Sequence, residues 1–292
     1  MKLISFSHAN RESWGTYASD GGVIDLGAEF INSLPTLKDY IGSDTKNKNR
    51  VNDYLRTGFG GGGGKTSDFP YKDIQLLPPI TNPHKIICVG LNYKKHAEET
   101  GNPIPTKPIL FPRWPESHVG HAQPILLPRE SAFLDYEGEL AVIIGKQGRR
   151  IKEEKAYDFV AGYSCYNEGS VRDWQRHSSQ YLPGKNFYQS GSFGPCLITT
   201  DEIVNPSELI LETRLNGLTV QKEKISDLIF SIPQLISYIS TYTEIYPGDV
   251  IVTGTPSGVG HAKVPPQWLK EGDIIEVEIT KIGTLKNTIK SD

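Results

Sequence analysis

The chain has 292 residues and a mass of 32.4 kDa, which suits one large domain or a main domain with a small partner. Its formal net charge is -3 and its pI is about 6.2, so no overall basic field would draw it to nucleic acid or to anionic lipid. No stretch approaches the roughly 20 apolar residues that span a bilayer. We therefore expect no nucleic-acid partner and no membrane partner, and we expect local charges to hold a small anionic substrate.

The start of the chain and its cysteines predict a reduced, cytoplasmic protein. The opening MKLISFSHANRESW contains too short an apolar run for a signal peptide. Cys88, Cys165 and Cys196 lie far apart and form no C-x-x-C pair. We expect these thiols to be small core residues.

The segment 1–79 is predicted to form a small N-terminal α+β domain. KLISF and WGTYASDGGVIDL predict two or three strands, with a turn at Asp20-Gly21. TLKDYIG and NRVNDYLRTG predict short helices, the second ending on Gly58. A glycine-rich and then proline-rich stretch follows, which predicts a flexible linker and a domain boundary near residue 80.

The glycine run GGGGGKT at 60–66 is similar to the end of a phosphate-binding loop. The first glycine of that motif is replaced by Phe59, and a polar, helix-like segment precedes the run in place of a buried strand. A surface loop is therefore favoured over a nucleotide site.

Residues 80–292 are predicted to form a mainly β domain with a few helices, so the chain belongs to the α+β class. Asn216-Gly217 between two strand-like runs predicts a hairpin. Helices are predicted over 92–100 with Asn92 as the cap, over 152–159, and over 231–242 with Pro233 in the first turn. The predicted strands are KIICVG, PILF, ELAVIIG, GYSCYN, CLITT, LILETRL, DVIVTGT and DIIEVEI.

Glu137 and Glu139 in DYEGELAVIIG would share one face of a strand, because successive side chains point to opposite faces. At a separation of about 6 Å and an effective dielectric near 20, their repulsion is on the order of 3 kcal/mol. The pair therefore needs either solvent, as on a half-exposed acidic face, or a cation. Glu168, at the end of the strand GYSCYN, could supply a third carboxylate to Mg²⁺ or Mn²⁺, or could instead cap a turn or pair with Arg172.

Two further stretches carry candidate chemistry. On a helix, His96 and Glu99 share a face, so the carboxylate could orient the imidazole as a general base, or the two could form a plain surface contact. TGTPSGVG at 253–260 could bring backbone N–H groups and the Thr255 hydroxyl to an anion, or could be a simple turn. Lys185 in LPGKNFY is a possible cation near such a site.

Taken together and in order, the motifs resemble the fumarylacetoacetate hydrolase superfamily, specifically its bacterial branch with a small N-terminal domain. The resemblance covers most of residues 80–292 and depends on VGLNYKKHAEE, KPILF, DYEGELAVIIGK, GYSCYNEGSVRDWQ, LPGKNF, PGDVIVTGTPSGVG and GDIIEVEI. It implies a mixed β-sandwich roll, a homodimer, and Mg²⁺ or Mn²⁺ held by an E-x-E pair and an aspartate. Glu168 occupies the position of that aspartate, and Leu91 and Arg113 replace residues common in short hydrolase members.

The resemblance also implies roles for individual residues. Glu137, Glu139 and Glu168 would bind the metal, and His96, Glu99 and Lys185 would be catalytic, with the first two on a mobile lid helix. The substrate contacts would be Arg172, Gln175, Thr255, Tyr93 and Arg113, the last at a polar entrance that could suit a hydroxylated tail.

The implied reaction is metal-dependent hydrolysis of a C–C bond in a 2,4-diketo acid, either an acylpyruvate or a diketo-deoxy sugar acid, to give pyruvate and a carboxylic acid. Water activated by His96 would attack the C4 carbonyl, and Lys185 would stabilise the departing enolate. Decarboxylation of oxaloacetate and isomerisation or hydration of a dienoate use the same enolate and stay open. A binding module with a structural cation is the alternative that involves no catalysis.

Overall fold

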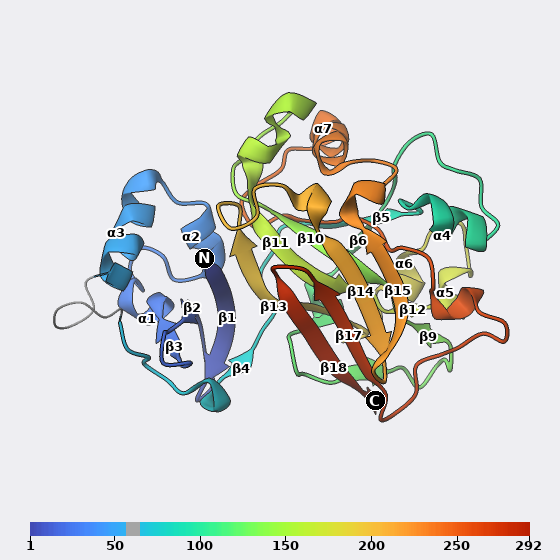
Figure 1. The fold of residues 1–292 in the computed structure, drawn as a ribbon, viewed down its shortest axis with the longest axis horizontal. Coiled ribbons are helices and arrows are strands. Elements are labelled where there is room, and N and C mark those ends of the chain that lie inside the picture. Colours follow the sequence, from blue (N-terminus) through green and yellow to red (C-terminus); the bar gives the residue numbers. More distant parts are fainter. Residues whose placement is uncertain (57–64) are drawn as a thin grey trace.

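The computed structural model describes residues 1–56 and 65–292, and two facing β-sheets form its centre (Figure 1). Among these residues the larger sheet has the order β3-β2-β1-β13-β11-β10-β16-β5-β6, with β4 beside β1 and β7 beside β13. The smaller sheet has the order β15-β14-β17-β18-β8, and β9 and β12 form a separate pair. The fold is a mixed α+β sandwich roll, which confirms the predicted class.

A strand lies on every run predicted beyond residue 80, although the bounds differ: DVIVTGT contains only Val250–Val252, and CLITT overlaps the end of Gly191–Thr199. A nine-residue strand at the C-terminal end was missed, because Leu285 and Ile289 are its only large apolar residues and the polar Asn287 lies between them on the buried face. The strands are β1 (Lys2–His8), β2 (Arg11–Tyr17), β3 (Val23–Asp25), β4 (Gln75–Leu76), β5 (Ile86–Gly90), β6 (Ile109–Arg113), β7 (His118–Val119), β8 (Ile125–Leu127), β9 (Leu134–Asp135), β10 (Gly138–Ile144), β11 (Val160–Asn167), β12 (Ser170–Val171), β13 (Gly191–Thr199), β14 (Ile210–Leu215), β15 (Leu218–Lys224), β16 (Val250–Val252), β17 (Ile274–Ile279) and β18 (Gly283–Ser291).

Strand β10 is buried on both faces, which explains its unbroken run L-A-V-I-I. Leu140 and Val142 pack into the core between the two sheets, together with side chains of β14 and β17. Ala141 and Ile143 belong to the core on the opposite face of the larger sheet. Successive side chains of β10 therefore pack into two different cores, because they point to opposite faces of the sheet.

The helices cover the faces and ends of these sheets. In Figure 1 α1, α2 and α3 lie at one side of the molecule, and α4, α5 and α6 gather at the other. No helix among the described residues combines the length and apolar character needed to cross a membrane. The helices are α1 (Leu26–Glu29), α2 (Leu37–Ile41), α3 (Thr45–Arg56), α4 (Lys94–Glu99), α5 (Arg172–Gln175), α6 (Leu182–Lys185) and α7 (Ile232–Tyr242), and a 3-10 helix spans Glu153–Phe159.

The N-terminal segment joins the larger sheet, because β1 pairs antiparallel with β13, with Lys2 opposite Ile198. The division into 1–79 and 80–292 stays a prediction. Gly58 and the glycine run 60–64 lie outside the described residues, and with them the possible phosphate-binding loop. The three cysteines are free and buried, as predicted for core thiols.

The start of α4 corrects one prediction. Tyr93, not Asn92, occupies the N-cap position of this helix. The Asn92 side chain donates to the Thr253 carbonyl at 2.7 Å and accepts from Phe230 N at 2.7 Å. Asn92 therefore ties the start of α4 to the loop that follows β16, where the helix comes to lie over the site described below.

Candidate active site and metal centre

Strand register brings the three glutamates together. β10 pairs antiparallel with β11, with Gly138 opposite Asn167, so the next residues outward, Glu137 and Glu168, also face each other. Glu168 N donates to the Glu137 carbonyl at 2.8 Å. One carboxylate oxygen from each of Glu137, Glu139 and Glu168 lies within 4.8 Å of the others, and all three side chains are buried. The prediction of a half-exposed, solvated acidic face is therefore wrong, and the alternative, a site for a cation, remains.

Two buried cations neutralise part of this cluster. Lys185 Nζ, from α6, donates to Glu137 at 2.9 Å and to Glu168 at 2.8 Å. Arg172 Nη2, from α5, forms ion pairs with Glu137 Oε1 at 2.6 Å and with Asp135 Oδ2 at 2.8 Å. Glu168 thus pairs with Lys185, while Arg172 pairs with Glu137 and Asp135.

The pKa values of the neighbouring carboxyls Glu137 and Glu139 are shifted in opposite directions, because in the described part of the chain only Glu137 has cationic partners. Burial opposes ionisation of Glu137, but Arg172 and Lys185 outweigh it and hold its pKa below the usual range. Burial, followed by repulsion from Glu168 and Glu137, raises the pKa of Glu139 well above its usual value. Burial also disfavours the Lys185 ammonium, yet Glu137 and Glu168 raise its pKa overall.

The donor set fits a divalent cation of the Mg²⁺ or Mn²⁺ type. Glu168 Oε1 is buried without a hydrogen-bond partner, and Glu139 has no cationic partner among the described residues. The directly connected cluster holds four carboxylates, those of Asp135, Glu137, Glu139 and Glu168, against the charges of Arg172 and Lys185. Two negative charges are left uncompensated, and hard, oxygen-binding cations suit such a set.

Gly138 separates the two glutamates because the smaller sheet approaches closely at this point. A Cβ atom there would lie 2.0 Å from Thr213 Oγ1. Gln221, also from the smaller sheet, accepts from Gly138 N at 2.9 Å and donates to Thr255 Oγ1 at 2.8 Å. The E-G-E spacing therefore reflects sheet packing as well as metal chemistry.

We expect the substitution Gly138→Ala to lower the free energy of unfolding by about 1–3 kcal/mol, as overpacking does. Thr213 Oγ1 has no hydrogen-bond partner among the residues that the structure describes, so Thr213→Ala removes the clashing atom without breaking a bond seen there. The double variant Gly138→Ala/Thr213→Ala should recover most of the loss in urea denaturation. A double variant no more stable than Gly138→Ala would show that the two positions are not in contact.

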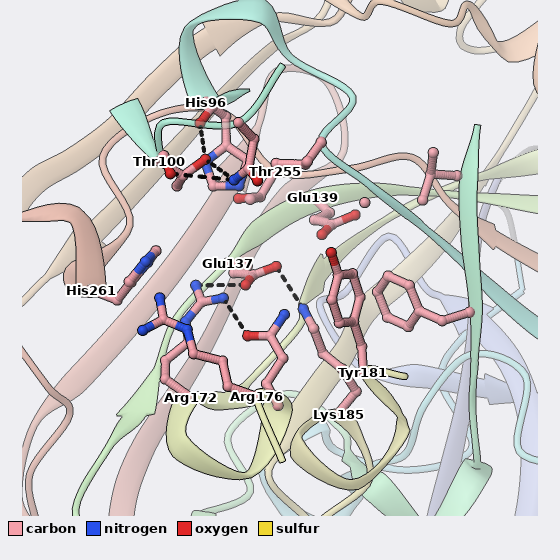
Figure 2. A pocket seen from close by; sticks show the side chains of 16 residues that line it. His96, Thr100, Glu137, Glu139, Arg172, Arg176, Tyr181, Lys185, Thr255 and His261 are labelled. Carbon is pink, nitrogen blue, oxygen red and sulfur yellow. Dashed lines mark hydrogen bonds and ion pairs between the residues drawn. The ribbon is translucent and has the colours of Figure 1, made fainter. Parts of the chain in front are cut away.

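A cavity of about 320 Å³ opens in front of the carboxylates, at the small end of the usual range for ligand pockets. Glu137, Glu139 and Lys185 line it, and His96 and Thr255 lie across from them (Figure 2). Its size suits a small acid.

The predicted contact between His96 and Glu99 is present. His96 Nδ1 lies 2.8 Å from Glu99 Oε1, and the His96 side chain is 8% exposed. A carboxylate only accepts, so Nδ1 carries the proton and Nε2 is left able to take one. Glu99 Oε2 also accepts from Gly258 N at 2.9 Å, which ties α4 to the loop 253–260. The pair is therefore more than a contact on an exposed helix face.

Thr255 lines the cavity, but its hydroxyl proton already has a partner. Thr255 Oγ1 donates to the Gly138 carbonyl at 3.0 Å and accepts from Gln221. Gln175 also lines the cavity, and its carbonyl oxygen accepts from Arg172 Nη1 at 3.0 Å, so its NH₂ group remains available to a ligand.

The structure buries two of the predicted substrate contacts, whose role stays a prediction. Arg113 is 2% exposed and donates to the Gly169 carbonyl at 3.0 Å and to Ser117 Oγ at 3.1 Å, so it supports the loop after Glu168 from behind. Tyr93 is 1% exposed and does not line the cavity. Both side chains are buried, so Arg113 does not form a polar entrance.

Several residues of the site were not anticipated. Asp135 continues the alternation of Glu137 and Glu139 by two residues and could have been found from that spacing. His261 directly follows the motif TGTPSGVG and lines the cavity. Arg176 and Tyr181 also line it. Gln221 comes from the other sheet, so no local pattern marks it.

Comparison with known proteins places the chain in a family. Residues 85–290 match the family model described as the C-terminal domain of fumarylacetoacetate (FAA) hydrolase. The chain belongs to the fumarylacetoacetate hydrolase family, as the ordered motifs predicted. Its relatives in this family include hydrolases, isomerases and tautomerases.

Three relatives illustrate the range of activities. The mitochondrial oxaloacetate tautomerase fahd2 of Xenopus laevis is 38% identical over 308 residues, which covers 99% of this chain and 90% of that protein. Fumarylacetoacetate hydrolase from psychrophilic Exiguobacterium antarcticum superposes with a TM-score of 0.83 at 33% identity, over all of both chains. Maleylpyruvate hydrolase from Sphingobium sp. SYK-6, in complex with manganese(II) and pyruvate, gives a TM-score of 0.81 at 25% identity, covering 100% of this chain and 99% of that one.

Proposed function

We propose that this protein is a divalent-metal-dependent tautomerase that interconverts the keto and enol forms of oxaloacetate. The observation that carries the proposal is the placement of an oriented base, His96 with Glu99, across one small cavity from the glutamate cluster. The likeness to an oxaloacetate tautomerase over 99% of the chain supports the choice of substrate and reaction.

The metal would be held by Glu137, Glu139 and Glu168, with Mn²⁺ supported by the manganese complex of a structural relative and Mg²⁺ by the same oxygen donors. When bound, it would act as a Lewis acid on the 2-oxo acid. The protein supplies the remaining chemistry through its own side chains.

His96 Nε2 takes the proton from C3 of oxaloacetate, and the electron pair of that C–H bond forms the C2–C3 double bond. Glu99 stabilises the imidazolium that results, because its carboxylate remains on Nδ1. The negative charge develops on the C2 oxygen, to which Lys185 can donate its third N–H group, because Glu137 and Glu168 accept only two of the three. A proton from water then adds to the C2 oxygen to complete the enol, and it leaves again in the reverse direction. In the reverse direction His96 returns the proton to C3.

The second candidate function is hydrolysis of a 2,4-diketo acid to pyruvate and a carboxylic acid. The His96–Glu99 pair favours it, because the same base could activate water for attack at C4. The manganese and pyruvate complex of the maleylpyruvate hydrolase supports the same direction. A substrate with a polar sugar tail is no longer favoured, because Arg113 is buried and cannot bind that tail at the entrance.

The test follows the decay of enol absorbance after crystalline enol-oxaloacetate is dissolved. A rate proportional to protein concentration, abolished by EDTA and restored by Mn²⁺ or Mg²⁺, supports the tautomerase. A coupled pyruvate assay over acylpyruvates and oxaloacetate runs in parallel. Pyruvate release from acylpyruvates without faster enol decay would favour the hydrolase, release from oxaloacetate would favour a decarboxylase, and no turnover of any substrate would favour a metal-stabilised binding module.

A further inference from the structure

One end of the cavity is cationic, and two of its side chains carry polar atoms without a partner among residues 1–56 and 65–292. Arg172 lies on α5, Arg176 directly follows that helix, and His261 lies in the 3-10 helix Gly260–Ala262. Figure 2 shows Arg176 and His261 beside Arg172, on the far side of Glu137 from His96 and Thr255. This end is separate from the catalytic pair.

The charge of Arg172 is already used inside the protein. Its Nε donates to Asp135 at 2.9 Å, its Nη1 to Gln175 at 3.0 Å, and its Nη2 pairs with Glu137. Arg172 is 6% exposed, so it is a structural part of the wall. A ligand at this end of the cavity must therefore bind to the neighbours of Arg172 and not to Arg172 itself.

The neighbours of Arg172 at this end of the cavity are Arg176 and His261. In the part of the chain that the structure describes, the Arg176 guanidinium makes no hydrogen bond or ion pair, although it lines the cavity. His261 Nδ1 is buried and has no hydrogen-bond partner within the described parts of the chain. Burial and then the charge of Arg172 lower the pKa of the His261 imidazole. Five guanidinium N–H groups and an imidazole are thus available at one place.

A 2-oxo dicarboxylate offers a matching group. Its first carboxylate and 2-oxo oxygen belong at the glutamate cluster, and its second carboxylate must extend away from those negative charges. Guanidinium groups bind carboxylates through paired N–H donors. We infer that Arg176 and His261 bind the second carboxylate of the substrate, so that the site selects 2-oxo dicarboxylates over monocarboxylates of the same length. The inference depends on the proposed function for the orientation of the substrate.

The experiment measures binding of two unreactive ligands to the Mn²⁺-loaded full-length protein by titration calorimetry. Malate and 2-hydroxybutyrate have the same chain length and differ only in a carboxylate or a methyl group at C4. We expect malate to bind at least about tenfold more tightly to the unmodified protein. Arg176→Gln should remove most of this preference and leave 2-hydroxybutyrate affinity within about twofold, while Arg176→Lys should keep part of it and His261→Gln should lose less.

Lys263→Gln is the matched control, because it removes a positive charge two residues from His261 that does not line the cavity. Equal weakening of both ligands in Arg176→Gln, or the same loss of malate in Lys263→Gln, would overturn the inference, and so would an absence of malate preference in the unmodified protein. A malate preference that depends on Arg176 in a protein that does not accelerate enol decay would support the subsite and reject the tautomerase. Accelerated enol decay without that preference would reject the subsite alone.

Discussion

Replacing Glu139 by Gln is expected to make the metal-free protein more stable and, at the same time, to abolish divalent-ion binding. Glutamine keeps the shape of the side chain and an oxygen that can accept from Gly254 N, which Glu139 Oε2 does at 2.5 Å. It removes the one carboxylate of the glutamate cluster that has no cationic partner among the described residues. The substitution should thus raise the stability of the metal-free protein and lower its affinity for the divalent ion.

The size of each effect follows from the geometry. At separations up to 4.8 Å and an effective dielectric near 20, each carboxylate pair repels by at least about 3.5 kcal/mol. Part of this is relieved in the metal-free protein by proton uptake, so we expect a gain of about 1–2 kcal/mol in the free energy of unfolding. Loss of the Lewis acid costs several kcal/mol at the transition state, so turnover should fall by about 10³-fold or more.

Thermal denaturation with and without Mn²⁺, and titration calorimetry of Mn²⁺ itself, measure both effects. Glu278→Gln is the control. Glu278 forms an ion pair with Arg214 at 2.8 Å on the smaller sheet, and its side chain is 45% exposed. It should change neither Mn²⁺ affinity nor the stability of the metal-free form by more than a few tenths of a kcal/mol. Unaltered Mn²⁺ affinity in Glu139→Gln would place the metal elsewhere, and a less stable metal-free form would show that other contacts of Glu139 outweigh its repulsion by the neighbouring carboxylates.

The sequence predicted those parts of the site whose position follows from local periodicity. The i, i+2 spacing of Glu137 and Glu139 placed them on one face, and the i, i+3 spacing of His96 and Glu99 predicted their contact. That Glu168 joins the pair depends on the register of β10 with β11, which no local pattern predicts. The residues alone offered Glu168 only as a possible third ligand, and the family resemblance implied that role.

Side-chain direction at the ends of elements could not be predicted in the same way. Arg113 and Tyr93 lie at the ends of regular elements, where a small change in backbone angle decides whether a side chain faces the cavity or is buried. Asn92 has the composition of a helix cap, yet its amide satisfies the backbone of two distant segments. Gln221 reaches Gly138 and Thr255 only because the second sheet packs on the first. These positions depend on tertiary packing, which local pattern does not encode.

Replacing His96 by Asn is expected to reduce kcat for enol decay by about 10² to 10⁴-fold, the usual contribution of a general base, with a small change in KM. Asparagine can still donate to Glu99, so α4 should stay in place while the group that takes the C3 proton is lost. Mn²⁺ affinity should be unchanged, because His96 is not part of the glutamate cluster. Stopped-flow enol decay and Mn²⁺ titration on the same preparation separate the two roles.

The neighbouring glutamates of α4 provide the matched comparison. Glu99→Gln keeps one acceptor but cannot hold both His96 Nδ1 and Gly258 N as a carboxylate does, so we expect about 10 to 10²-fold lower kcat. Glu98 is one residue away, 57% exposed, and 3.8 Å from Lys94, so Glu98→Gln should be neutral. If His96→Asn kept kcat within about threefold, the base would have to lie elsewhere in the cavity, and both the tautomerase mechanism and the hydrolase alternative would lose the residue on which they depend.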